Sequence, residues 1–147
     1  MDRANVNLLN DLRNNREFLL SILDQPIVFH KVYKNITGSV TAALMLSYAT
    51  QMSDEADPAR GGWFSLDANR WEDETGLSRK EQVTARKCLR EMGVLEERKQ
   101  GMPALLEFKV NFQEIAVRLH EYAETLPGGG KKVVSKAAEG SGNAIAT

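Results

Sequence analysis

The pattern of hydrophobic and polar positions predicts a series of amphipathic helices followed by a short stretch with β-strand character. Hydrophobic residues recur at helical spacing over residues 6–23, which indicates an amphipathic helix with a break near Asn14 and Asn15. Because proline disfavours a helical conformation at the residue before it, this segment should end before Pro26. We expect Pro26 itself to open the next helix.

The helix that Pro26 opens is expected to turn one apolar face towards the core. Four residues at i, i+3, i+4 and i+7 form this face: Phe29, Val32, Tyr33 and Ile36. Gly38 should end the helix, and Ser39 suits the cap of a third helix over 40–52. This third helix is apolar on most sides, so it should form the buried centre of the domain.

The middle of the chain has the spacing of two short helices joined by a tight turn. A polar loop leads into a β-prone stretch, Trp63 to Leu66, and a helix over 67–75 follows, which Gly76 should stop. Ser78 and Glu81 then have the spacing of a capping box, in which each side chain bonds the backbone N–H of the other residue.

The second of these helices begins at Arg79 and is expected to have two different faces. Its inward face should contain Gln82, Ala85, Leu89 and Met92. Its outward face should contain Lys80, Val83, Thr84, Lys87 and Arg90. A short helix, a glycine-containing turn and a second helix with a basic outer face are typical of a helix-turn-helix.

The stretch after Gly93 predicts a strand, a tight turn over 100–103 and a second strand. Apolar and polar residues alternate along the second strand, with Leu106, Phe108, Val110 and Phe112 separated by Glu107, Lys109 and Asn111. Trp63 to Leu66 can supply a third strand. A closing helix over 114–126 has the apolar positions Ile115, Val117, Leu119 and Tyr122. The expected fold class is mainly α with a small β-wing, a winged helix-turn-helix with an N-terminal helical extension.

Composition bounds the domain organisation and the chemistry. A hydrophobic fraction of 42% over 147 residues allows one core, so we expect an N-terminal helical extension (1–24), a winged-helix domain (25–126) and a flexible tail (127–147). Cys88 stands alone, which excludes an internal disulfide and the usual Cys/His zinc spacing. His30 and His120 lack partners at metal spacing, and no catalytic constellation stands out. We therefore expect a non-enzymatic protein without cofactor or metal.

Targeting signals are not apparent in the chain. The N-terminus lacks a charged-then-apolar signal pattern, and no apolar run is long enough to span a membrane. We expect a cytoplasmic protein with no membrane partner.

The distribution of charge is more informative than its sum. The net charge is −1, which argues against non-specific coating of nucleic acid. Residues 54–77 contain seven acids and two bases, whereas residues 78–109 contain eight bases and five acids. The basic excess therefore coincides with the second helix and the predicted wing.

A family resemblance is carried by the stretches PIVFHKVYKNITGSVTAALMLS, TGLSRKEQ and GVLEERKQGMP. Over about residues 20–120 the chain resembles winged-helix proteins of phages, prophages and plasmids, similar to the N-terminal domains of phage replisome organisers and DnaD-like primosome proteins. The resemblance implies binding of double-stranded DNA in replication initiation or its control, with replication proteins of the host or element as further partners. Because only a short tail follows Leu126, we expect no helicase-loading domain.

In a helix-turn-helix, the second helix lies in the major groove with its N-terminal residues on base edges. The residues expected to contact DNA there are Ser78, Arg79, Lys80, Thr84 and Lys87. Those expected to reach the backbone or minor groove from the wing are Arg98, Lys99 and Gln100. The alternative interpretation is a solvated charged surface, since Glu72, Asp73 and Glu74 lie close to the proposed DNA face and would repel it.

The N-terminal amphipathic segment is a candidate for self-association. Its apolar stripe consists of Leu8, Leu12, Leu19, Ile22 and Leu23. Exposed apolar stripes usually mark interfaces, so we expect a homodimer or a higher homo-oligomer; the alternative is that the helix packs back on its own domain.

Two classes of function follow from these patterns. The first is a DNA-binding winged-helix protein of a mobile genetic element, acting in replication initiation or its control. The alternative is a winged-helix assembly module, or a transcriptional regulator, without strong intrinsic affinity for DNA.

Overall fold

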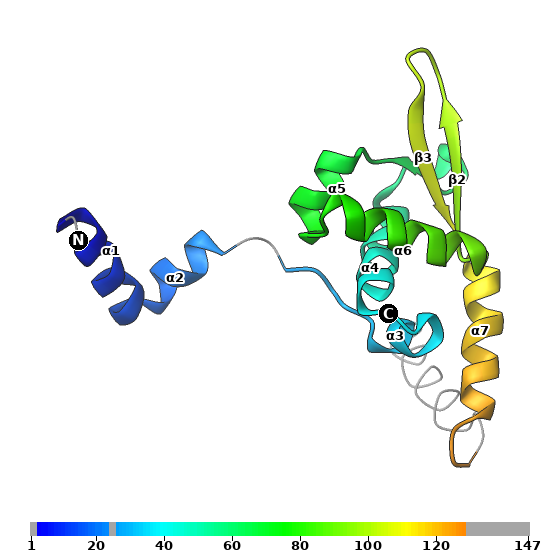
Figure 1. Cartoon of the computed structure of the whole chain (residues 1–147), viewed down its shortest axis with the longest axis horizontal. Helices are drawn as coiled ribbons and strands as arrows, with labels where there is room; N and C mark the ends of the chain where they lie inside the picture. The colour runs from blue at the N-terminus through cyan, green and yellow to red at the C-terminus, as the bar shows by residue number, and fades with distance from the viewer. Residues whose placement is uncertain (1–2, 24–25, 129–147) are drawn as a thin grey trace, which may run out of the picture.

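The computed structural model describes residues 3–23 and 26–128, and this part of the protein is mainly helical with one small antiparallel sheet (Figure 1). From residue 129 onward the predicted tail lies outside the described residues. The elements are α1 (Arg3–Asn14), α2 (Arg16–Ile22), α3 (Lys31–Thr37), α4 (Val40–Glu55), the short 3₁₀ turn η1 (Pro58–Arg60), β1 (Trp63–Ser65), α5 (Ala68–Thr75), α6 (Arg79–Glu91), β2 (Leu95–Gln100), β3 (Leu105–Val110) and α7 (Phe112–Glu124).

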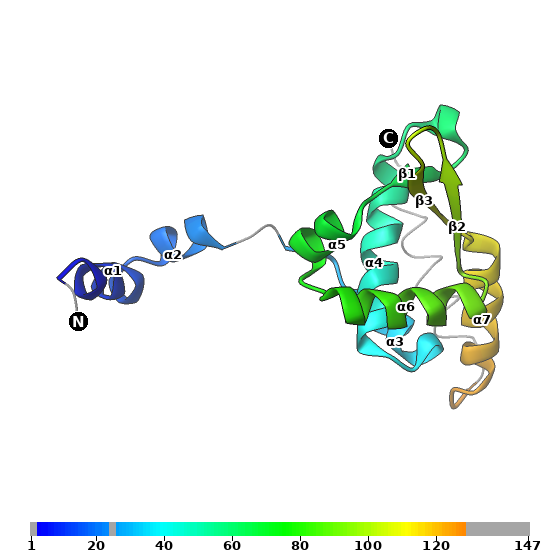
Figure 2. The same cartoon turned by 45° about the horizontal axis from the view of Figure 1, so that its top comes forward.

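The N-terminal segment forms two helices, and the predicted break is confirmed at Asn15. Both views place α1 and α2 apart from the other helices (Figures 1 and 2). Of the predicted apolar stripe, Leu8 and Leu23 are exposed, at 46% and 59%. The side chains of the other three stripe residues, Leu12, Leu19 and Ile22, lie outside the described part of the structure.

The prediction that Pro26 opens a helix is wrong. Residues 26–30 form neither helix nor strand, and α3 begins only at Lys31. The backbone N–H of His30 donates to Ser47 Oγ of α4 at 3.1 Å, so the segment is held by a partner far along the chain instead of by a helical turn. Phe29 therefore precedes α3 and is exposed. The other three residues of the predicted apolar face, Val32, Tyr33 and Ile36, do pack against the core.

The central helix α4 is the buried centre that its apolar sequence predicted. Gly38 ends α3 with a positive φ of 75°, and Ser39 Oγ accepts from the Ala42 N–H at 3.2 Å. The most deeply buried positions of α4 include Ala42, Ala43, Met45, Leu46 and Ala49. Small side chains at several of these positions allow α3 and α6 to approach α4 closely. The helix continues to Glu55, into the stretch that was expected to be a loop.

The three predicted strands are present, and they form an antiparallel sheet in the order β1-β3-β2. The register pairs Phe64 with Phe108 and Leu95 with Val110, so these four side chains share one face. Phe108 packs edge-on against Trp71 of α5 with ring centroids 5.3 Å apart. This face of the sheet therefore closes the core, and Trp71 packs within it.

The closing helix α7 begins two residues earlier than predicted. Asn111 caps it, because its Oδ1 accepts from the Glu114 N–H at 3.1 Å. Phe112 is consequently the first residue of α7 and is exposed, instead of continuing the strand. Of the apolar positions noted for this helix, Ile115 is buried and Val117 is exposed, so Val117 does not contribute to the core.

Candidate nucleic-acid interface

The start of α6 is fixed by local hydrogen bonds that the sequence predicted. Gly76 ends α5 with a positive φ of 76°, which turns the chain towards α6. Ser78 Oγ accepts from the Glu81 N–H at 3.2 Å, and the Ser78 N–H donates to Glu81 Oε1 at 3.0 Å. The bond from the Ser78 N–H to the Glu81 carboxylate lowers the pKa of that carboxyl. The predicted capping box is confirmed, and the Ser78 side chain is used within it.

The inner face of α6 is locked to α5 by Gln82. Its Nε2 donates to the Ala68 carbonyl at 3.0 Å and to the Leu77 carbonyl at 2.9 Å. Ala85 and Leu89 continue the buried face, as predicted from the helical spacing. The spacing also placed Gln82 inward, but nothing in the sequence indicated these two bonds.

The outer face of α6 brings together four of the five DNA-contact residues that were predicted for this helix. Lys80, Thr84 and Lys87 are exposed, and Thr84 Oγ1 donates to the Lys80 carbonyl at 3.1 Å. Arg79 is exposed too, with its Nη2 donating to Asn69 Oδ1 at 2.6 Å. Within residues 3–23 and 26–128, the ammonium groups of Lys80 and Lys87 form no ion pair. This side of the helix therefore presents uncompensated positive charge.

The flank of α6 next to β2 is charge-paired. Arg86 Nε and Nη2 donate to the two Glu97 oxygens at 2.7 and 2.8 Å, and Arg90 Nη1 reaches Glu97 Oε2 at 3.4 Å. The hydrogen bonds from Arg86 hold the pKa of the Glu97 carboxyl below its usual range. The charge of Glu97 is thus neutralised where α6 meets the hairpin. Arg90 was predicted on the outer face, but its guanidinium is partly paired with Glu97.

The β2–β3 hairpin separates the three predicted wing residues onto two faces of the sheet. Lys99 is two residues beyond Glu97, so it points to the side on which α6 lies. Arg98 and Gln100 point to the opposite side by the same alternation. Arg98 Nε donates to Glu107 Oε1 at 3.2 Å, and its guanidinium lies 4.1 Å from the centre of the Trp63 ring. Only Lys99 of the three extends the basic side of α6.

The acidic residues that precede α6 lie in the second half of α5. Glu72, Asp73 and Glu74 are all exposed. The structure therefore retains the acidic region that the sequence placed beside the candidate interface, and the basic part of this interface is formed by α6 and Lys99.

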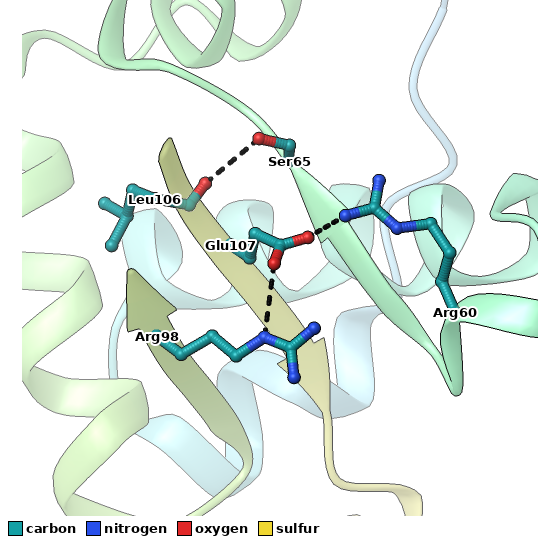
Figure 3. A network of polar contacts seen from close by, with 5 residues as sticks. All are labelled: Arg60, Ser65, Arg98, Leu106 and Glu107. Atoms are coloured by element: carbon teal, nitrogen blue, oxygen red, sulfur yellow. Dashed lines mark hydrogen bonds and ion pairs between the residues drawn. The ribbon is translucent and has the colours of Figure 1, made fainter. Parts of the chain in front are cut away.

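A polar cluster on the far face of the sheet was missed by sequence reasoning. Glu107 is only 2% exposed, and its carboxylate is paired with Arg60 of η1 and with Arg98 (Figure 3). The alternating pattern of β3 assigned Glu107 to solvent. Its pairing with Arg98 follows from the strand register, but Arg60 is 47 positions away in the chain and gave no local signal.

Among the residues that the structure describes, the other titratable groups form no second cluster of this kind. His120 Nε2 lies 3.9 Å from Glu124 Oε1 on the surface of α7, and His30 packs beside the Tyr33 ring. Burial raises the pKa of the Cys88 thiol. The described residues contain no group of three His, Cys, Asp or Glu side chains that could hold a metal ion. Nor does any helix among them have the length and apolar character needed to cross a membrane.

The chain matches no protein-family model, and comparisons with curated proteins and with solved structures give no significant match.

Proposed function

We propose that the domain formed by residues 26–128 is a winged helix that binds double-stranded DNA, with α6 as the recognition helix and the β2–β3 hairpin as the wing. The order of its elements supports this: α5, a glycine turn and α6 are followed directly by a hairpin whose third strand is β1. The observation that carries the proposal is the outer face of α6, where Arg79, Lys80, Thr84 and Lys87 are exposed together.

The residue types on this face suit a major groove. Arg79 and Lys80, near the N-terminal end of α6, can donate to guanine O6 and N7, and Thr84 can contact either a base edge or a thymine methyl. Val83 is 63% exposed on the same side, and an apolar side chain there also fits a thymine methyl. Lys87 and Lys99 are placed to contact phosphates, which fix orientation without reading sequence.

The contacts that fix α6 in place support sequence-specific base contacts by this helix more than non-specific attraction to the DNA backbone. Gln82 joins α6 to α5, and the Arg86–Glu97 pair joins α6 to β2. A helix held at two points along its length keeps its outward side chains in one geometry, which direct base contacts require. The resemblance of the sequence to replication proteins of phages and plasmids supports a role in replication initiation or its control.

A second candidate function, assembly, is favoured by the N-terminal helices. Besides Leu8 and Leu23, the described apolar side chains that are exposed there include Val6, Leu9 and Leu20. Pairing of α1 and α2 between two copies would cover these side chains and give a homodimer. The two candidates are compatible, because a dimer presents two α6 helices to one duplex.

The test of DNA binding is a titration of labelled mixed-sequence duplex with the full chain across a salt series. The informative variant is Lys80→Ala/Lys87→Ala on α6. Its matched control is Lys31→Ala/Lys34→Ala, which removes the same charge from two exposed lysines of α3. Weakened binding in the α6 variant alone supports the proposal, and equal binding by both variants and the parent contradicts it.

A further inference from the structure

A second cationic surface lies on the face of the sheet that is turned away from α6. An open pocket of about 440 Å³ is found there between η1, β1 and the hairpin. Its lining includes Arg60, Ser65, Arg98, Gln100, Leu105 and Glu107. Figure 3 shows the Arg60 and Arg98 side chains approaching the Glu107 carboxylate from two sides. The pocket therefore has two guanidinium groups at its wall.

The charges in this pocket do not cancel. Glu107 carries one negative charge and pairs with both Arg60 and Arg98, which leaves an excess of one positive charge. The carboxylate is almost completely buried, whereas the two arginine side chains are 47% and 37% exposed. Moving a carboxylate out of water costs free energy, and pairing it with arginine often contributes little net stability in return. Its effect here is to hold two exposed guanidinium groups next to each other.

Each arginine is also supported from a second direction. Arg60 sits in η1, which Asp57 caps by accepting the Ala59 N–H at 3.0 Å. The positive φ of 65° at Gly61 then turns the chain back towards β1. Arg98 lies over the ring of Trp63, and Lys109 Nζ is 6.0 Å from the centre of the same ring. The guanidinium groups are thus positioned before any ligand arrives.

We propose that this pocket binds a phosphate group, either of a free nucleotide or of a nucleic-acid backbone. A guanidinium has five N–H donors in a planar fork that matches phosphate oxygens. Of these, Arg98 uses Nε for Glu107, which leaves the two terminal nitrogens for a ligand. The Gln100 amide at the edge of the pocket adds a further donor. The site is on the opposite side of the sheet from α6 and does not depend on duplex binding by that helix.

Trp63 provides a direct readout of occupancy, because its ring is covered by the Arg98 guanidinium. The chain has two tryptophans, and the other, Trp71, is buried in the core. Titration of the full chain with inorganic phosphate, at ionic strength held constant with chloride, should change the tryptophan fluorescence saturably. Trp63→Phe should remove the fluorescence change while calorimetry still detects phosphate binding.

The mutational test is Arg60→Gln, chosen because Arg60 is half exposed and its replacement leaves the core intact. Loss of one charge-assisted partner should weaken phosphate binding about tenfold or more, and Arg60→Lys should restore part of it. The melting temperature of each variant shows that it is folded. A folded Arg60→Gln protein with the parent's phosphate affinity and fluorescence response overturns the proposal, as does a parent that shows no saturable response.

Two further probes distinguish the two sources of the phosphate. Both are used in the Lys80→Ala/Lys87→Ala variant, in which DNA binding by α6 is expected to be weakened. Deoxyadenosine monophosphate that binds more tightly than inorganic phosphate, with Arg60 required, indicates a free nucleotide. An oligonucleotide that binds more tightly than the mononucleotide, again with Arg60 required, indicates a nucleic-acid backbone. Because DNA binding by α6 is weakened in both experiments, any binding that requires Arg60 reports on the pocket. A failure of phosphate binding at the pocket is thus distinguished from a failure of duplex binding by α6.

Discussion

Arg86 of α6 and Glu97 of β2 form a two-pronged ion pair across the junction of helix and hairpin. The bonds Nε–Oε1 and Nη2–Oε2 measure 2.7 and 2.8 Å, and the Arg86 guanidinium also lies 5.7 Å from the centre of the Phe108 ring. Both side chains are largely covered. The pair fixes the angle between α6 and the hairpin, so the geometry of the candidate DNA surface depends on it.

The first prediction concerns Glu97→Gln and pH. The pKa of Glu97 is lowered in the folded protein, mainly by the hydrogen bonds from Arg86. Its contribution to stability is therefore present above the pKa of the unfolded chain and is lost as pH falls through the lower, folded-state pKa. Glu97→Gln should cost about 1–3 kcal/mol at neutral pH, because a charge-assisted pair is weakened.

Urea unfolding from neutral pH to below pH ~4 measures this effect, since an unperturbed Glu titrates near there. The difference between parent and Glu97→Gln should shrink towards zero at the acid end. Glu96→Gln is the matched control, because Glu96 is the exposed neighbour and should change stability little. A difference that stays constant over the whole pH range would contradict the assigned role.

The second prediction separates the two faces of α6. Leu89 is completely buried where α6 packs on α4, so Leu89→Ala should cost roughly 2–5 kcal/mol through lost methylenes and a cavity. Val83→Ala, on the exposed face of the same helix, should change stability by no more than about 0.5 kcal/mol. Denaturant unfolding of the two variants measures both values, and similar costs at both positions would mean that the faces are assigned wrongly.

These faces were predictable because the signals for them are local. The spacing of Gln82, Ala85 and Leu89, together with the Ser78–Glu81 capping box, defines α6 within fourteen consecutive residues, 78–91. The turn glycines and the alternation along β3 located the hairpin in the same way. Local pattern therefore sufficed for the helices and strands that form the candidate site.

Long-range partners set the features that the sequence did not reveal. Residues 26–30 form no helix, and the His30 N–H bonds instead to Ser47, seventeen positions away. The burial of Glu107 depends on Arg60, and that pairing exists only once η1 folds over the sheet. Arg98 and Lys99 look alike in sequence, yet strand alternation sends them to opposite faces, and only the register of the sheet decides which one accompanies α6.

The third prediction tests α6 as the DNA helix. Lys80→Ala/Lys87→Ala should weaken duplex binding and reduce the salt dependence by about one phosphate contact for each lysine. Both side chains are exposed, so the melting temperature should hardly change. Anisotropy titrations at several salt concentrations give the slope, with Lys31→Ala/Lys34→Ala as the charge-matched control. An unchanged slope in the α6 variant would assign the duplex contact to another surface.

The last prediction is that α1 and α2 join two copies of the chain. Leu9 and Leu20, one on each helix, are 44% and 54% exposed, and exposed apolar surface of this kind often marks an interface. Leu9→Glu/Leu20→Glu places charge on this surface without touching the domain that begins near Pro26. We expect light scattering to show a dimer for the parent and a monomer for this variant, with unchanged thermal unfolding of the remaining domain.

In this variant the affinity for duplex DNA should fall together with the mass in solution. A dimer carries two α6 faces, and once one face binds, the other is held at a high effective concentration near the same duplex; a monomer lacks this effect. Val117→Glu on α7 is the matched control, since Val117 is similarly exposed at 49% but lies outside the N-terminal helices. Deletion of residues 1–23 should reproduce the effect of the double substitution. If the parent is already monomeric, or if the N-terminal variants keep its oligomeric state, α1 and α2 do not hold the copies together.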